Sequence, residues 1–271
     1  MNFSALDVGI LTPALIAGLL VLATHVPLGM QVLDRGIVFI DLAIAQIAGL
    51  GVIGADALGL PDSSYGGVAV QAAAVTAALL GAWLLTWTER RAPAQQEALI
   101  GVMFILAACA SILLLSSNPH GGEHLKDLLI GQILWVSTAQ IGWLAAISAL
   151  LLLALASGQI ARLGRFGFYA IFAIAVTASV QLVGVYLVFA SLIIPALGTR
   201  VLGVRKDAGR RRLIVAYLIG AVGYALGLAL SAVFDLPSGA VVVWALAGCG
   251  VFASLATARH SGMPPQSDLR A

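Results

Sequence analysis

Apolar runs about as long as a bilayer is thick recur along the whole chain, and they limit the folds that it can adopt. A helix that spans the hydrocarbon core needs about 20 mainly apolar residues. Charged residues make up only 10% of the chain and its mean hydropathy is +1.05, whereas a soluble domain is about a quarter charged. We therefore expect an all-α, polytopic membrane protein with a single transmembrane domain at 1–258 and a polar tail at 259–271. The clearest runs lie at 8–33, 38–60, 67–87, 98–117, 128–157, 213–233 and 239–258.

Arginine and lysine are distributed unevenly between these runs. Basic residues favour the cytoplasmic side of a membrane protein. If the basic connections all face that side, they hold 13 of the 14 basic residues, and the opposite connections hold only Lys126. The pattern predicts an N-terminus outside the cell and a C-terminus in the cytoplasm. The basic residues concerned are Arg35, Arg90, Arg91, Arg162, Arg165, Arg200, Arg205, Lys206, Arg210, Arg211, Arg212, Arg259 and Arg270.

Residues 168–199 have basic flanks on both sides, so this segment has to leave the cytoplasm and return. Its 32 residues allow two helices of about 16 residues, each about 24 Å long at 1.5 Å per residue. That length is less than the ~30 Å of a hydrocarbon core. We expect a short or broken helix with its break near Gly184, and therefore about nine membrane crossings, or eight if this segment supplies one fewer.

Four segments resemble the membrane-spanning permeases of ABC transporters that import zinc, manganese or iron. The most specific is QLVGVYLVFASLIIPA at 181–196, in which a Val-Gly pair is followed by a small residue with Leu and then by Ile-Pro-Ala. The others are FDLPSG at 234–239, LIGQIL at 129–134, and the turn and helix at 29–51. They occur in the family's order, and the resemblance covers about 10–258.

The resemblance implies a type II ABC importer fold in a bacterial inner membrane and a homodimer around a central path. It also implies a cytoplasmic ATP-binding subunit and an extracytoplasmic solute-binding protein. No G-x-x-x-x-G-K-[ST] phosphate loop occurs in the sequence, and that loop is what cradles ATP phosphates in P-loop proteins. We therefore expect a transport subunit that is not an enzyme, holds no permanent cofactor, and depends on a separate ATPase. A divalent metal ion is the cargo that the resemblance implies.

Asp41 is the candidate cargo contact, because a carboxylate within a membrane is costly and usually faces a cavity or a partner. The alternative is that Asp41 lies shallowly near Arg35 and is solvated there. The resemblance implies Gly-Asp with a His four residues later, but Ala45 occupies that position here. Aligned by Gly51 instead, Gln46 takes the place of the His. A carboxylate with an amide is a harder ligand set than Asp with His and suits zinc less well.

Two further regions are candidate sites. His120, Glu123 and His124 lie in the loop on the predicted outer side and could capture a divalent ion weakly, although their spacing matches no established closed metal site; a solvated polar loop is the alternative. The resemblance implies that the neighbourhood of 200–212 docks into the ATPase, whereas binding of anionic lipid is the other explanation of its charge. The docking candidates are Pro195, Ala196, Gly198, Arg200 and Arg205.

Three functional hypotheses follow. The first is the permease of an ATP-driven importer for zinc, manganese or iron. The second keeps ATP-driven import but changes the cargo to a metal chelate or a cobalamin-like compound, which the missing His favours. The third is a secondary transporter driven by an ion gradient, for which Asp41 and Asp56 could carry protons. The charge balance and the absence of a basic, aromatic-rich patch predict no nucleic-acid partner.

Overall fold

The computed structural model describes residues 8–62, 66–115, 129–157, 164–200 and 208–261. Within these residues eight helices are long and apolar enough to cross a membrane, and a ninth apolar helix, α9, is shorter. This confirms the predicted all-α, polytopic fold. The helices are α1 (Val8–Arg35), α2 (Ile40–Ala57), α3 (Gly66–Arg91), α4 (Gln96–Leu115), α6 (Thr138–Ala156), α8 (Gly164–Val183), α9 (Val185–Gly198), α10 (Ala208–Phe234) and α11 (Ser238–Ser261). Short 3-10 turns lie at η2 (Leu60–Asp62), η3 (Pro93–Gln95) and η4 (Ile133–Trp135).

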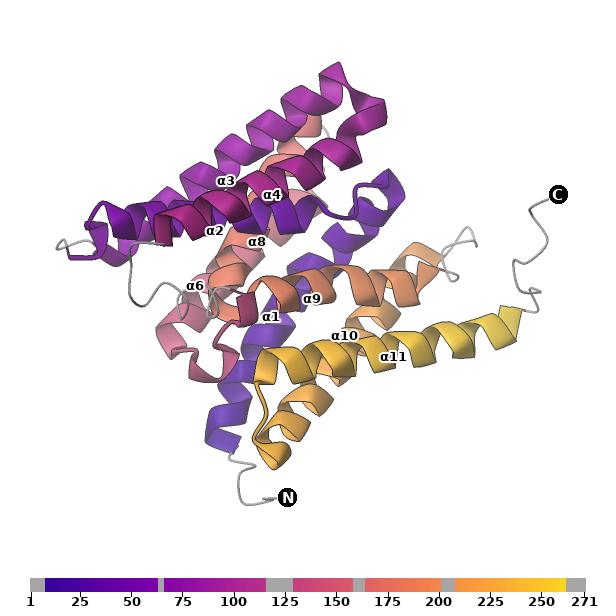
Figure 1. Cartoon of the computed structure of the whole chain (residues 1–271). Coiled ribbons are helices and arrows are strands. Elements are labelled where there is room, and N and C mark those ends of the chain that lie inside the picture. The colour runs from indigo at the N-terminus through magenta and orange to yellow at the C-terminus, as the bar shows by residue number, and fades with distance from the viewer. Residues whose placement is uncertain (1–7, 63–65, 116–128, 158–163, 201–207, 262–271) are drawn as a thin grey trace.

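The helices form two groups joined through a central set (Figure 1). Helix α2 packs on α3 and α4 on one side, and α10 packs on α11 on the other. Helix α1 passes between the groups and contacts α6, α9 and α10, while α8 contacts α3 and α2. Helix α8 is the most buried of the eight long helices, because neighbouring helices surround it: 67% of its apolar window is buried, compared with 17% for α6.

The predicted span at 128–157 is wrong at its start, because helix α6 begins only at Thr138. Gly131 has a φ of 72°, a left-handed conformation that ends regular helix. Ser137 then starts α6 with a capping box: its side chain accepts from the backbone N–H of Gln140, and the Gln140 side chain accepts from the backbone N–H of Ser137. The Ser-x-x-Gln spacing is visible in the sequence and is a recognised signal for the start of a helix.

The break near Gly184 is confirmed. Gly184 has a φ of 81° and separates α8 from α9. Helix α9 has 14 residues, which corresponds to about 21 Å and is less than the ~30 Å hydrocarbon core. At the far end of the chain, α11 continues to Ser261, three residues beyond the predicted domain limit at 258.

Three glycines from separate parts of the chain meet at this break, and we call Gly131, Gly184 and Gly239 the glycine junction. A Cβ on Gly131 would overlap the backbone of Val183 and Gly184, and a Cβ on Gly184 would overlap the backbone of Gly131 and Ile130. A Cβ on Gly239 would overlap the Ile130 carbonyl oxygen. The segments at 129–134, 181–196 and 234–239, which carry the family resemblance, are therefore one packed unit.

Charged groups of four helices gather at one end of the bundle, which we call the arginine-rich end. Arg165 Nε of α8 lies 3.7 Å from Glu89 Oε1 of α3, and Arg212 Nη1 of α10 lies 3.8 Å from Asp34 Oδ1 of α1. The Arg35 guanidinium lies 3.9 Å from the centre of the Phe168 ring, a favourable cation–π contact. These basic residues share one end, as the sequence predicts; that this end faces the cytoplasm stays a prediction.

Candidate functional site

Asp41 lies in the first turn of α2 at the arginine-rich end, and its side chain is only 1% exposed. Asp41 lies near the end of its helix, as the alternative interpretation held, but its side chain is not solvated there. Neither carboxylate oxygen makes a hydrogen bond of good geometry, although the backbone N–H groups of Asp41 and Leu42 lie close to the carboxylate. Arg35, the nearest basic residue in sequence, stacks on Phe168 instead. Because buried charges are normally paired or coordinate metals, a buried carboxylate without a partner side chain is a candidate ligand for a cation.

Glu97 in the first turn of α4 brings a second carboxylate to the same place. Glu97 Oε1 accepts a hydrogen bond from the backbone N–H of Phe39 at 3.2 Å, just before α2 begins. Glu97 lies close enough to Asp41 for their negative charges to repel each other. The second oxygen of Glu97, Oε2, is buried without a partner. Two neighbouring carboxylates with free oxygens attract a cation, because hard cations prefer oxygen ligands. Sequence reasoning missed Glu97, because only the packing of α4 on α2 places it there.

Gln46 is also buried, at 4% exposed, but it lies five residues after Asp41 on α2. At about 100° per residue the two side chains leave the helix about 140° apart. The sequence spacing predicts this divergence, and α2 is one continuous helix across both residues. Within the described residues, no group of three or more His, Cys, Asp or Glu side chains gathers as a closed metal site.

A neutral hydrogen-bond network fixes the helices behind the two carboxylates. Gln96 Nε2 donates to the Leu85 carbonyl at 3.1 Å and reaches the Tyr169 hydroxyl at 3.4 Å. Thr88 Oγ1 donates to Gln96 Oε1 at 3.1 Å. The network ties α4 to α3 and α8 immediately beside Glu97, and buried side chains satisfied in this way rigidify the helices that carry them.

The predicted docking residues differ in exposure. Pro195 and Ala196 are buried within α9, and Gly198 faces α11, where an added Cβ would lie 3.1 Å from the Gly250 carbonyl oxygen. These three residues shape the end of α9, whereas Arg200 is exposed directly after it. Arg205 lies outside the described residues, and so do His120, Glu123 and His124 of the predicted outer loop.

His25 and Asp56 lie away from the carboxylate pair. His25 is fully buried in α1, where its Nδ1 lies 2.9 Å from the Val21 carbonyl oxygen and 3.1 Å from Thr24 Oγ1. It is therefore a packed histidine whose Nδ1 is hydrogen-bonded within its own helix. Asp56 is exposed in the last turn of α2, at the opposite end from Asp41.

Comparison with known proteins places these features in a family. The sequence model of the ABC 3 transport family matches residues 7–159 and 153–257. The chain belongs to the ABC 3 transport family. This confirms the resemblance that the motifs indicated, and the segments of the glycine junction lie within the matched residues.

Individual relatives agree with this family membership. The chain is 25% identical to the manganese transport system membrane protein MntC of Halalkalibacterium halodurans, over 86% of this chain and 82% of that protein. It is 26% identical to the chelated iron transport system membrane protein YfeC of Yersinia pestis, over 71% of this chain and 68% of that protein. The fold of this family member is similar to that of PsaBC from Streptococcus pneumoniae, with a TM-score of 0.71, 21% identity and 90% of both chains covered.

Proposed function

We propose that this chain is the membrane-spanning permease of an ATP-driven importer for a divalent metal ion. The observation that carries the proposal is the family match across residues 7–159 and 153–257. Relatives named for manganese and for chelated iron transport support a metal cargo. A cytoplasmic ATP-binding subunit, an extracytoplasmic solute-binding protein and a second copy of the permease complete the transporter.

Asp41 and Glu97 are the residues that we assign to the cargo on its way through the arginine-rich end. Their unpartnered oxygens form a ligand set that suits manganese or ferrous iron better than zinc, since zinc sites favour nitrogen and sulfur. A neutral histidine would bring no negative charge to the site, whereas Asp41 and Glu97 can each bring one. Because the two carboxylates belong to different helices, a relative movement of α2 and α4 would alter the distance between them and release the ion.

The ATP-binding subunit docks where α9 ends, with Arg200 as the exposed contact. Replacing this residue, as Arg200→Glu, removes an attraction and adds a repulsion toward an acidic partner surface. We expect the affinity between permease and ATP-binding subunit to fall at least about tenfold, which is about 1.4 kcal/mol. The measurement is co-purification of the two subunits from detergent-solubilised membranes.

Arg90→Glu is the matched control, because Arg90 is also exposed at the arginine-rich end but lies on α3. The control is expected to retain the ATP-binding subunit. Equal losses in the two variants would show that general charge, and not the end of α9, determines docking. If the wild-type chain never co-purifies with an ATP-binding subunit, the proposed function itself fails.

A further inference from the structure

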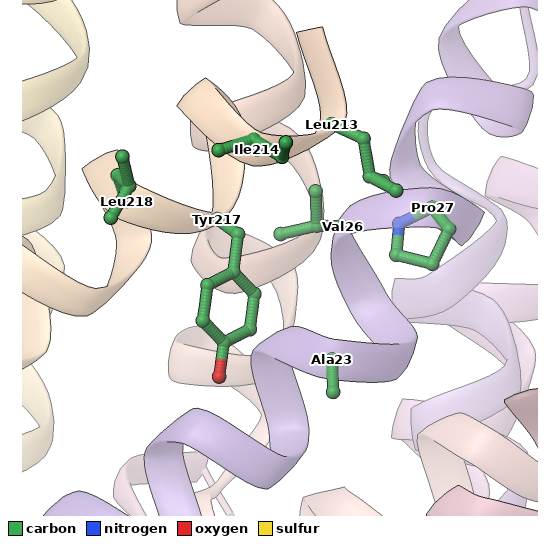
Figure 2. Close-up of a pocket in the computed structure, with 7 residues that line it drawn as sticks. All are labelled: Ala23, Val26, Pro27, Leu213, Ile214, Tyr217 and Leu218. Atoms are coloured by element: carbon green, nitrogen blue, oxygen red, sulfur yellow. The ribbon is translucent and has the colours of Figure 1, made fainter. Parts of the chain in front are cut away.

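An apolar groove runs along the outside of the bundle between α1 and α10, close to the arginine-rich end (Figure 2). Its volume is about 320 Å³, and its lining residues are Ala23, Val26, Pro27, Leu213, Ile214, Tyr217 and Leu218. The α10 wall is open to the surroundings, as Ile214 is 49% and Leu218 55% exposed. Helices α1 and α10 are both long and apolar enough to cross a membrane, so a groove on their outer face is within reach of lipid chains.

The groove has a local cause in α1. Proline has no backbone N–H, so Pro27 cannot make the helical hydrogen bond to the carbonyl of Ala23, and its ring pushes that turn apart. Ala23 and Pro27 are both part of the groove wall. On the other wall, the Tyr217 hydroxyl donates to the Leu19 carbonyl at 3.1 Å. This bond holds α10 against α1 at one position, while the small Ala23 leaves space beside it.

Three consecutive arginines lie one turn before the groove on α10. Arg210 is three and four residues before Leu213 and Ile214, and Arg211 is three residues before Ile214; residues at these spacings share a helix face. Arg210 and Arg211 are both exposed. The side chain of Arg212 is 11% exposed and is paired with Asp34, yet its Nε and Nη2 are buried without partners. The end of the groove therefore carries more positive charge than Asp34 neutralises.

We propose that this groove is a binding site for an anionic phospholipid, with the phosphate beside Arg210 and Arg211 and one acyl chain along the apolar walls. Charge and shape both favour this occupant. From Arg210 to Leu218 the helix rises about 12 Å, which takes a chain from the headgroup level into the hydrocarbon core. Basic residues beside the membrane surface attract anionic lipids by an amount equivalent to about fivefold in affinity each. This site is independent of the cargo and of ATP.

The test is native mass spectrometry of the full-length chain in detergent, titrated with phosphatidylglycerol and with phosphatidylcholine of identical acyl chains. We expect phosphatidylglycerol to bind more tightly. The double variant Arg210→Gln/Arg211→Gln is expected to lose roughly 25-fold in phosphatidylglycerol affinity and little in phosphatidylcholine affinity. The control Arg90→Gln/Arg91→Gln removes two exposed arginines of the same end from α3 and is expected to bind as wild type does.

A second pair of variants tests the groove itself. Leu218→Trp fills it from the lipid side and is expected to weaken both lipids, whereas Leu226→Trp lies on the same helix outside the groove, is similarly exposed at 49%, and should bind as wild type. Equal affinity for the two lipids, or equal losses in both arginine double variants, would overturn the proposal. So would a Leu218→Trp chain that binds lipid normally but no longer dimerises, because a second copy would then be the occupant.

Discussion

Replacing Gly184 with alanine is expected to destabilise the folded permease by roughly 2–6 kcal/mol, a large part of the 5–15 kcal/mol that stabilises a typical folded protein. Two separate effects contribute. A φ of 81° with a ψ of 161° is a backbone conformation that essentially only glycine adopts, and it costs a residue with a Cβ about 1–3 kcal/mol. The added Cβ would also overlap the backbone of Gly131 and Ile130, and overpacking of this kind typically costs about 1–3 kcal/mol. The expected result is a sharp loss of folded protein and a lower melting temperature in detergent.

Gly36→Ala separates these two effects. Gly36 has a similar φ of 70°, but an added Cβ would meet no atom within 4 Å. Only the cost of the backbone conformation applies at Gly36, so this variant should lose about 1–2 kcal/mol of its free energy of unfolding. If Gly184→Ala and Gly36→Ala have the same folded yield and melting temperature, the close packing of the glycine junction contributes nothing to stability.

Asp41→Asn is expected to reduce metal uptake about 30-fold or more without destabilising the protein. The amide keeps the shape of the side chain but removes a charged ligand, and a charge-assisted interaction of about 2 kcal/mol corresponds to that factor. The melting temperature should stay the same or rise, because the buried carboxylate has no partner for either oxygen and an unpaired charge in a membrane protein is costly. The measurements are uptake of labelled manganese by cells and thermal unfolding of the purified chain.

Two further variants show how the Asp41→Asn result should be interpreted. Glu97→Gln should lower uptake in the same direction, since Glu97 shares the site. Asp56→Asn changes an exposed carboxylate at the opposite end of α2 and should transport as wild type does. If Asp41→Asn lowers the melting temperature as much as it lowers uptake, Asp41 has a structural role and the cargo assignment is wrong. Unchanged uptake would remove the assignment as well.

Much of the fold could be predicted from the sequence, because the length of an apolar run and the distribution of arginine are local properties. The same holds for the break at Gly184, which follows from a segment too short for two full crossings. The start of α6 was missed because an apolar run does not show where helix begins; the Ser137–Gln140 capping box does. The meeting of the three junction glycines depends on tertiary packing, which spacing along the chain does not reveal.

The candidate site was predictable only in part. Asp41 is recognisable because a lone carboxylate beside an apolar run is unusual, and its divergence from Gln46 follows from helix geometry. Its burial and its neighbour Glu97 depend on how α4 packs against α2, which the sequence leaves open. The docking segment was found by resemblance, but the structure distinguishes buried Pro195 and Ala196 from exposed Arg200.

Energy coupling is the most direct test of the central claim. The measurement is manganese uptake into proteoliposomes that contain the chain with or without its ATP-binding subunit, energised by ATP or by a proton gradient, with the solute-binding protein supplied in every sample. The proposed function predicts uptake only when the ATP-binding subunit and ATP are both present. Uptake by the chain alone under a proton gradient would contradict it and identify a secondary transporter.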